Sequence, residues 1–428
     1  MSDLHGKIAA AIDGLLPKAA GLFERVRALS ASGDGVTRAA FGEVETAAGM
    51  AVADFARKSG LEAGFDHVGN LQVTSGSVTD APVILASHLD SVPNGGNYDG
   101  LAGVIAGVVI QAAFRAAGVP GTDQVRTIGF RGEESPWFGT AYLGSKLLLG
   151  QCTVKELTTL TRGDTGLSLL EHLKRLGHPV DDAVLQEKRL RPEAVKAYLE
   201  LHIEQGPVLE TGGHPVGIAS AARGNIRYPF ARCFGHYAHS AAVPRHLRSD
   251  AAMATAKLIA FADLRWSELI AAGHDDLVFT CGIFHTNPAE HAMTKVPGEI
   301  TFSLNLGATS AAVMDSFHEA LLERIKALET EHKVRFDLGS RVGTRATPLD
   351  AGIAKRLETA ARSAGIETVR MPTVGHDAAM FARAGVASAV LLVRNQNGSH
   401  NPEEAMRMED FGAATKVLGM ATADLLAG

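Results

Sequence analysis

The sequence predicts an α/β protein with a smaller α+β domain inserted into it. The chain has 428 residues, which exceeds the size at which one hydrophobic core stops growing. Its first half alternates strand-like and helix-like segments, and this pattern changes from about Gly217. Polar residues cluster where the predicted strands end, which is where open α/β sheets bind ligands.

The α/β pattern is clearest in the first half of the chain. Phe23, Val26 and Leu29 fall on one face of an early helix. Residues 82–87 (PVILAS) then predict a buried strand, and residues 101–118 predict a helix that packs on it. Residues 124–130 (QVRTIGF) predict a second strand of the same sheet.

The α/β pattern resumes near Thr347, with a helix over 353–365 and a strand over 387–393. The larger domain is therefore predicted to be discontinuous. We expect it to comprise residues 1–216 and 334–428, with residues 217–333 as the insert.

Two segments of the insert carry clear hydrophobic periods. A strand over 299–307 places its apolar residues on one face at period two: Ile300, Phe302, Leu304 and Leu306. A helix over 310–329 repeats its apolar residues at helical spacing: Met314, Phe317, Leu321 and Leu328. Both patterns predict core packing and indicate no chemistry.

Composition limits the classes of partner. A formal charge of -6 and a pI near 6.3 give no basic footprint for nucleic acid or an acidic membrane, so a small-molecule partner fits better. No stretch of about 18 apolar residues and no basic leader occurs, and we expect a cytoplasmic protein. Cys152, Cys233 and Cys281 lack metal-ligand or disulfide spacing and are interpreted as core residues.

The most informative motif is SHLDSVPNGGNYDG, which follows the predicted strand 82–87. His88 and Asp99 are ligand types for a divalent metal, and Asp90 can orient the histidine. The alternative is a surface loop in which Asp99 only caps the next helix.

The second motif, RGEESPWFGT, follows the strand 124–130 and contains the adjacent residues Glu133 and Glu134. Their side chains point in different directions on an extended backbone, so one carboxylate can bind a metal while the other moves a proton. Paired glutamates are also common on solvated surfaces.

Two histidines come in comparable positions, His202 in YLELHIEQG and His400 in NGSHNPEE. Either one alone fits a hydrogen-bonded or surface histidine. Four separate strand ends that each deliver a His, Asp or Glu are harder to explain by packing, and the set favours a metal site.

With these motifs together, the sequence resembles the hydantoinase/carbamoylase branch of the M20 metallopeptidase family, which includes N-carbamoyl-amino-acid hydrolases, β-ureidopropionases and allantoate amidohydrolases. The motifs that carry the resemblance are HLDSVPNGGNYDG, EESPWFGTAYLGS, HIEQGPVLE, GHDA and SHNPEE, in the family's order. The resemblance covers nearly the whole chain. It implies a zinc-peptidase-like catalytic domain with an inserted ferredoxin-like lid domain that forms a homodimer.

The resemblance also implies the roles of individual residues. Asp99 becomes the ligand that bridges two metal ions, with His88 and His202 on one ion and Glu134 and His400 on the other. Glu133 becomes the general base that takes a proton from the metal-activated water, and Asp90 supports the site. His239, in GHYAHSAAVP, corresponds to a histidine that reaches the partner subunit's active site. Zinc or manganese suits these ligands, and cobalt and nickel are tolerated.

The sequence departs from the family pattern at residues that recognise the substrate. Gly307 stands where these enzymes usually carry an arginine for the substrate carboxylate, and Thr294 stands where they carry an asparagine. Arg227 and Lys295 are candidate replacement cations, along with Arg223 and Arg245. Gln205 and His376 lie in family motifs near the expected pocket and are candidates for substrate contact or for support of the metal ligands.

These observations predict an amidohydrolase that cleaves a linear amide or ureido C–N bond of a small molecule. A dipeptidase or aminoacylase with the same metals is the nearest alternative. A non-catalytic metal-binding dimer is a third possibility, although it would not require Glu133 and the five proposed ligands to be present together.

Overall fold

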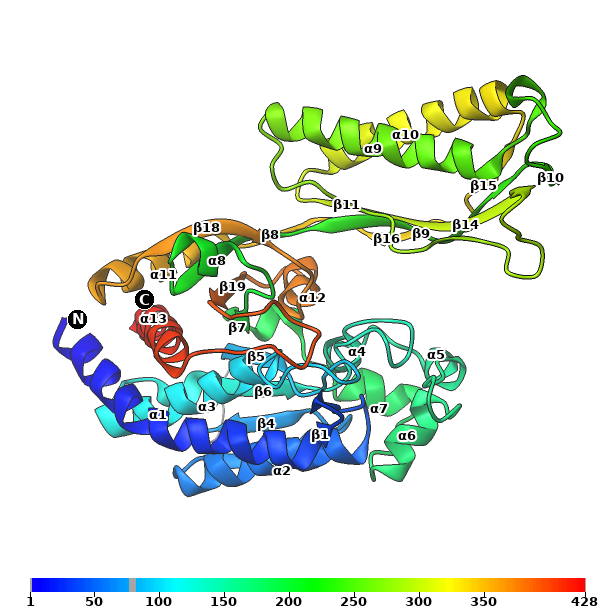
Figure 1. Ribbon diagram of the computed structural model, residues 1–428. Coiled ribbons are helices and arrows are strands. Elements are labelled where there is room, and N and C mark those ends of the chain that lie inside the picture. Colours follow the sequence, from blue (N-terminus) through cyan, green and yellow to red (C-terminus); the bar gives the residue numbers. More distant parts are fainter. Residues whose placement is uncertain (1, 77–81, 428) are drawn as a thin grey trace. The chain divides into compact units, whose positions relative to one another are not determined.

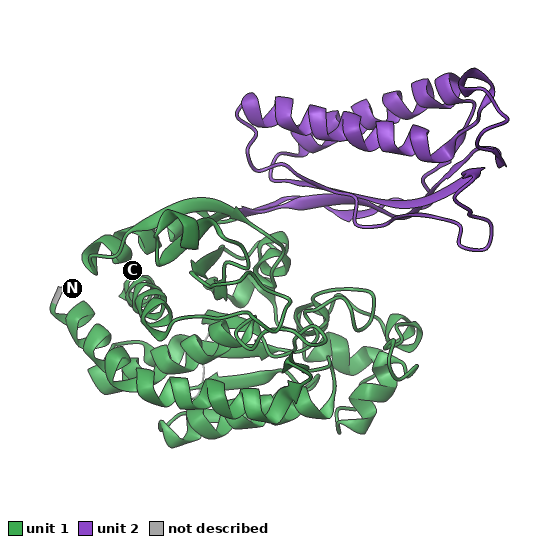
Figure 2. Ribbon diagram, viewed as in Figure 1, with its two compact units in different colours: residues 1–220, 349–428 green, residues 221–348 purple. Residues whose placement is uncertain are grey.

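The computed structural model describes residues 2–76 and 82–427, which form two compact units (Figures 1 and 2). Unit 1 comprises Met1–Ser220 and Leu349–Gly428, and unit 2 comprises Ala221–Pro348. The prediction placed the second boundary at residue 333. The unit extends further because β15 (Arg335–Asp337) and β16 (Val342–Thr344) pair with its strand β9 (Gly224–Phe234).

Unit 1 is an α/β domain, as the sequence predicts. Its helices are α1 (Ser2–Ser30), α2 (Glu43–Lys58), α3 (Leu101–Ala117), α4 (Leu143–Leu148), α5 (Val154–Thr159), α6 (Leu169–Arg175), α7 (Asp182–Glu187), α8 (Val208–Gly212), α11 (Ala351–Ser363), α12 (Ala378–Arg383) and α13 (Met408–Ala427). Its principal strands are β3 (Glu62–Phe65), β4 (Leu71–Thr74), β5 (Val83–His88), β6 (Val125–Phe130), β7 (Ala197–Ile203), β8 (Val216–Ala222), β18 (Thr368–Thr373) and β19 (Ser388–Val393). A short pair, β1 (Ala31–Ser32) and β2 (Gly35–Val36), lies apart from the main sheet.

The main sheet runs in the order β17-β8-β19-β7-β5-β6-β4-β3, where β17 is Thr347–Pro348, and β18 pairs with β8. At its centre, β5 is parallel to β6 and to β7, and β19 is parallel to β7. The carboxyl ends of these four strands therefore meet at one edge of the sheet. Every residue of β5, β7 and β19 is buried, as expected for central parallel strands.

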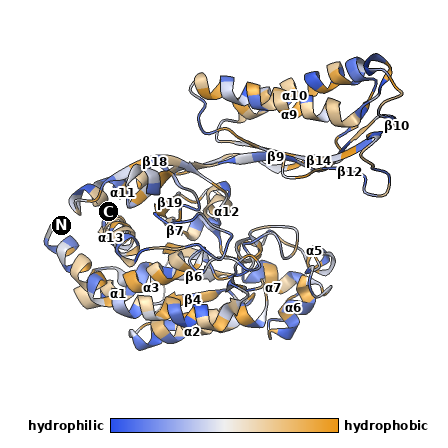
Figure 3. Cartoon of the chain, in the orientation of Figure 1, coloured by the Kyte–Doolittle hydropathy of each residue, from blue (hydrophilic) through white to orange (hydrophobic). Residues whose placement is uncertain are grey.

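Helix α3 is the central helix of unit 1. It packs on β5, β6 and β7, while α1 and α13 pack against it. This explains why α3 is buried continuously from Leu101 to Phe114. In Figure 3, by contrast, hydrophobic and hydrophilic residues alternate along α1 and α2. Phe23 and Val26 of α1 are buried as predicted, but Leu29 is 45% exposed because it lies close to the end of the helix.

Unit 2 is an α+β domain with a main sheet, a short two-stranded sheet of β10 and β13, and two long helices. The order of the main sheet is β11-β14-β9-β15, with β12 on β14 and β16 on β9. The bounds not yet given are β10 (Ala238–His239), β11 (Val278–Thr280), β12 (Phe284–Thr286), β13 (Lys295–Val296), β14 (Glu299–Ala308), α9 (Ala251–Ala271) and α10 (Ala311–His332). All eight predicted core residues of its strand and helix are buried. Both helices lie on the same face of the sheet (Figure 1).

Two further predictions concern helix hydropathy and the cysteines. Within residues 2–76 and 82–427, no helix has the length and apolar content that crossing a membrane requires. Cys152 and Cys233 are buried, as predicted. Cys281 lies at the margin of the unit 2 core and is only partly buried.

Candidate metal centre

The candidate ligands lie at the carboxyl edge of the parallel strands in unit 1. His88 is the last residue of β5, and His202 is the penultimate residue of β7. Glu134 follows β6, and His400 follows β19. The four motifs lie far apart in the sequence, and the parallel strand order brings them to one edge.

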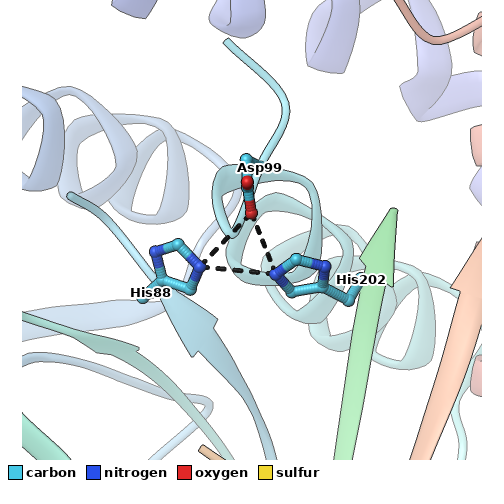
Figure 4. Close-up of side chains that lie close together, drawn as sticks. All are labelled: His88, Asp99 and His202. Atoms are coloured by element: carbon cyan, nitrogen blue, oxygen red, sulfur yellow. Dashed lines mark hydrogen bonds and ion pairs between the residues drawn. The ribbon is translucent and has the colours of Figure 1, made fainter. Parts of the chain in front are cut away.

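The first cluster consists of His88, Asp99 and His202 (Figure 4). The Nε2 atoms of the two histidines are 3.3 Å apart. Asp99 Oδ1 lies 3.5 Å from His88 Nε2 and 3.1 Å from His202 Nε2. Gly100 makes this approach possible: its φ is +68°, and a Cβ there would overlap the imidazole of His88.

The donor set of this cluster fits a divalent cation. The Nδ1 atoms face backbone carbonyl oxygens, of Asp90 at 3.1 Å for His88 and of Ile203 at 2.9 Å for His202. A carbonyl only accepts, so each Nδ1 carries the proton and each Nε2 presents a lone pair. Asp99 Oδ1 is buried and has no hydrogen-bond partner. Three acceptors that face one another without a donor form a set of ligands suited to a cation.

The second cluster consists of Asp99, Glu134 and His400. His400 Nε2 lies 3.3 Å from Asp99 Oδ2 and 3.2 Å from Glu134 Oε1. Asp99 therefore presents one carboxylate oxygen to each cluster. His400 has a φ of +61°, an uncommon backbone conformation for a residue with a side chain, and such conformations concentrate at functional sites.

Asp90 joins the β5 and β6 motifs. Its Oδ1 and Oδ2 accept hydrogen bonds from the backbone N–H groups of Glu133 and Glu134, both at 3.0 Å. Asp90 Oδ1 also lies 3.4 Å from His88 Nδ1. One fully buried carboxylate thus fixes both the histidine and the turn that carries the two glutamates.

Glu133 is buried beside the first cluster, and one of its carboxylate oxygens lies within 4.8 Å of ligand atoms of His88 and Glu134. Burial raises the pKa of Glu133 well above its usual range, and the negative charge of Glu134 adds to this effect. A carboxyl group with a raised pKa is suited to accept a proton and later to donate it.

The electrostatics of the ligands reflect a concentration of buried carboxylates. Burial alone would lower the pKa of His88, but the adjacent carboxylates of Asp90 and Asp99 outweigh it and raise the pKa well above its usual range. Hydrogen bonds to Asp99 and Glu134 raise the pKa of His400 to about 10. The carboxylates therefore stabilise positive charge at the site, and protons and metal ions compete to provide it.

Two of the predicted substrate contacts lie against the ligands. Gln205 Nε2 donates to Asp99 Oδ2 at 2.8 Å and lies 3.4 Å from His400 Nε2. The ring of His376 packs on the ring of His202, with centroids 4.2 Å apart. Burial first, and then the charge of His202, lowers the pKa of His376 well below its usual range. Both contacts are to metal-ligand candidates.

The remaining predicted residues, His239, Arg227 and Lys295, belong to unit 2. His239 is exposed on β10 and pairs across the strand with Lys295 on β13. Lys295 Nζ lies 3.2 Å from Glu290 Oε2, and Arg227 Nε donates to Asn305 Oδ1 at 3.0 Å. His239 Nδ1 accepts from the Ala241 N–H at 3.1 Å, so each of the three side chains has a polar partner within unit 2.

A profile of Peptidase family M20/M25/M40 matches residues 84–423, a span that contains every candidate ligand. The chain belongs to this family. N-carbamoyl-L-amino acid amidohydrolase of Geobacillus stearothermophilus is 34% identical over 389 residues, which are 90% of this chain and 92% of that protein. Allantoate amidohydrolase of Escherichia coli (strain K12) is 29% identical over 367 residues, covering 85% and 86%.

Solved structures agree with the family assignment. A hydantoinase/carbamoylase family amidase from Burkholderia ambifaria superposes with a TM-score of 0.83 and 26% identity, over 96% of this chain and 97% of that chain. The predicted zinc-peptidase-like fold class is therefore confirmed.

Two residues of this M20-family chain that sequence reasoning missed border the metal centre. Glu200 lies on β7, fully buried, and accepts from Ser87 Oγ at 3.0 Å and from the Ala378 N–H at 2.9 Å. A glutamate inside an otherwise buried strand was the available signal. Glu404, the second glutamate of SHNPEE, contacts the backbone around Asp99. Its signal was weaker, because the motif was interpreted through His400 alone.

Proposed function

We propose that this chain is a metal-dependent amidohydrolase that cleaves a linear amide or ureido C–N bond of a small molecule. The observation that carries the proposal is the pair of clusters that share Asp99, with Glu133 beside them. In this proposal His88 and His202 hold one ion and Glu134 and His400 hold the other. Two divalent ions bound there would supply an activated water and stabilise negative charge on the carbonyl oxygen.

The chain's own residues supply proton transfer and orientation. Glu133 takes the proton of the attacking water and delivers it to the leaving nitrogen, a role suited to its raised pKa. Asp90 holds the backbone of Glu133 and the ring of His88 in fixed positions. Gln205 and His376 stand in the proposal as substrate contacts or as supports for the ligands they touch.

The metal identity is proposed as zinc or manganese, with cobalt and nickel as alternatives, because imidazole and carboxylate ligands suit all four. Metal analysis of the purified protein by mass spectrometry gives the stoichiometry. Two ions per chain are expected, and one ion or none would contradict the shared role of Asp99. The Asp99→Asn variant is the matched control, because it weakens both clusters at once.

The substrate class is the finer part of the proposal. The named activities of the relatives, on N-carbamoyl-L-amino acids and allantoate, indicate a ureido compound. Gly307, however, lies on β14 where its missing side chain leaves no clamp for a carboxylate. In the proposal, Arg227 or Lys295 supplies the replacement cation, or the substrate has no carboxylate at that position.

The test is ammonia release by the metal-loaded protein, with a chelated control. The substrates are N-carbamoyl-β-alanine, N-carbamoyl-L-amino acids, allantoate and uncharged ureas and amides. Chelator-sensitive turnover of a charged ureido compound supports a replacement cation, and turnover of uncharged compounds alone supports a changed specificity. Cleavage of dipeptides without ammonia release would favour the dipeptidase alternative and contradict the proposal.

The homodimer and the role of His239 are also proposals. If His239 completes the partner's site, an equal mixture of His239→Ala and Glu133→Gln subunits gives one intact site in each mixed dimer. Activity should recover to about a quarter of wild type after subunit exchange. No recovery, in a protein that sedimentation shows to be dimeric, would exclude this role. The cytoplasmic location is tested by cell fractionation.

A further inference from the structure

Glu404 is a buried carboxyl group that contacts the metal centre without belonging to the proposed ligand set. Glu404 is only 3% exposed, whereas the adjacent residue Glu403 is exposed. Glu404 Oε1 accepts hydrogen bonds from the backbone N–H of Tyr98 at 2.8 Å and of Asp99 at 3.2 Å. This carboxyl group therefore holds the chain at the shared ligand from a position 305 residues further along the sequence.

Ser399 connects the Glu404 carboxyl group to the Asp99 carboxylate. Ser399 Oγ lies 2.6 Å from Glu404 Oε2 and 2.7 Å from Asp99 Oδ2. A hydroxyl group has one proton, so it donates to only one of the two carboxyl groups. Ser399 is within donating distance of both carboxyl groups and links Glu404 to Asp99 whichever of them takes its proton.

These hydrogen bonds fix the orientation of the Asp99 carboxylate. Asp99 Oδ2 accepts from Ser399 and from Gln205, while Asp99 Oδ1 has no hydrogen-bond donor and faces the two histidines. Rotation of the carboxylate would remove these hydrogen bonds. The oxygen left without a donor is the one that lies between His88 and His202.

Gly96 provides the space that Glu404 occupies. A Cβ atom at Gly96 would overlap the Glu404 carboxyl group. The second glycine of NGGNYDG and the second glutamate of SHNPEE therefore fit together in the folded chain. This contact explains a feature of both motifs that the proposed ligands do not use.

We infer that Glu404 is a positioning residue that orients Asp99, through two backbone N–H groups and Ser399, for metal binding. The inference rests on the proposed function only in taking Asp99 as a metal ligand. It predicts that Glu404 sets metal affinity although it binds no metal itself, as outer hydrogen-bond partners of metal ligands do.

The experiment compares Glu404→Leu with Glu404→Gln. Leucine fills the volume but leaves the N–H groups of Tyr98 and Asp99 without their acceptor and breaks the link from Glu404 to Ser399. Glutamine keeps an oxygen for the two N–H groups, and its amide donates to Ser399, which leaves the Ser399 proton for Asp99. Glu403→Gln is the matched control, because it makes the same change at the exposed neighbour.

Metal affinity is measured on the stripped, full-length protein by competition with a chromophoric chelator, for zinc and for manganese. We expect Glu404→Leu to bind metal about 10–100-fold more weakly, and Glu404→Gln and Glu403→Gln to bind as wild type does. A folded Glu404→Leu protein with wild-type affinity would overturn the inference. So would a Glu404→Gln protein as impaired as Glu404→Leu.

Two more variants keep the test decisive if Glu404→Leu does not fold. Ser399→Ala removes the connection to Asp99, and Gly96→Ala displaces Glu404 from the other side. Each should weaken metal binding by about tenfold, with the circular dichroism of the stripped protein unchanged. Wild-type affinity in both would overturn the inference.

The outcomes separate this inference from the proposed function. Metal affinity is read without any substrate, so a wild-type protein that binds metal but hydrolyses no tested compound contradicts the function and leaves the role of Glu404 intact. A Glu404→Leu protein that binds metal and turns over substrate normally contradicts the positioning role and leaves the function intact.

Discussion

The two units bury very different side chains. Among the described residues, the buried Asp, Glu and Arg all lie in unit 1, where they include Arg38, Asp90, Asp99, Glu200 and Glu404. The buried polar side chains of unit 2 are Thr255, His318 and Thr347. Both units nevertheless have continuous hydrophobic cores.

This difference indicates that the candidate chemistry lies in unit 1, whereas unit 2 is almost entirely a structural core. A buried charge costs free energy unless it is paired, as Arg131 and Glu45 are, or binds a metal. The interior of unit 2 consists mainly of apolar side chains, with few buried polar ones. Its stability should respond to core packing, whereas the activity of unit 1 should respond to single polar atoms.

The largest expected effect is the loss of turnover in Glu133→Gln. The change removes the proton acceptor and keeps the shape, so kcat should fall by about 10²–10⁴-fold while metal content stays at the wild-type value. The melting temperature should not fall, because an amide is less costly to bury than a carboxylate. Glu193→Gln, at an exposed position of unit 1, is the control. Unchanged turnover would remove Glu133 from the mechanism.

Phe302→Ala tests the opposite behaviour in unit 2. Phe302 is fully buried and packs edge-to-face on Phe336, with ring centroids 6.0 Å apart. The cavity should cost about 3–5 kcal/mol in urea unfolding. Phe230→Ala removes a ring that is 74% exposed and should change stability by less than about 0.5 kcal/mol. Metal affinity should be unchanged, and its loss in a folded variant would contradict the separation of the units.

Metal removal should destabilise unit 1 alone. A metal that binds only the folded state adds about 2.7 kcal/mol when free metal is 100 times its Kd. Hydrogen exchange followed by mass spectrometry should show faster exchange in β5, β7 and the segment around His400 after chelation, with no change in unit 2. The Asp99→Asn protein should not respond to chelator. An equal response in both units would contradict the comparison.

The smallest expected difference between the units is in the reactivity of their buried cysteine thiols. Burial raises the thiol pKa of Cys152, in unit 1, and of Cys233, in unit 2, to about 11. At pH 8 both are almost entirely protonated and should not react with a disulfide reagent, and reactivity should rise only as the pH approaches 11. Cys281 should react first. Three thiols should react in denaturant, and rapid reaction of all three in the native protein would contradict their burial.

Elements that depend on a local hydrophobic pattern were predictable from the sequence, whereas boundaries that depend on long-range strand pairing were not. The run 82–87 and the helix after it were recognisable because hydrophobic period and length belong to neighbouring residues. The end of unit 2 was placed too early, because the pairing of β15 and β16 with β9 joins segments about a hundred residues apart. The exposure of Leu29 does not follow from the helical period, because the residue lies close to the end of α1.

The candidate site divides in the same way. His88, Asp99, Glu134, His202 and His400 were identifiable because each ends a recognisable strand or motif, and the parallel strand order brings them together. The contacts of Glu404 with Tyr98, Asp99 and Ser399 were not identifiable, because nothing in SHNPEE shows which loop the second glutamate meets.

The sequence by itself determined the fold class, the family resemblance and the identity of the candidate ligands, since these depend on residue type, order and local period. The tertiary structure decided which atoms face one another: the bare Oδ1 of Asp99 between two Nε2 atoms, and its Oδ2 held by Ser399 and Gln205. The reason is physical. Hydrophobic burial is non-directional and can be recognised in one segment, whereas hydrogen bonds and metal ligation depend on distances and angles that arise only when distant strands align.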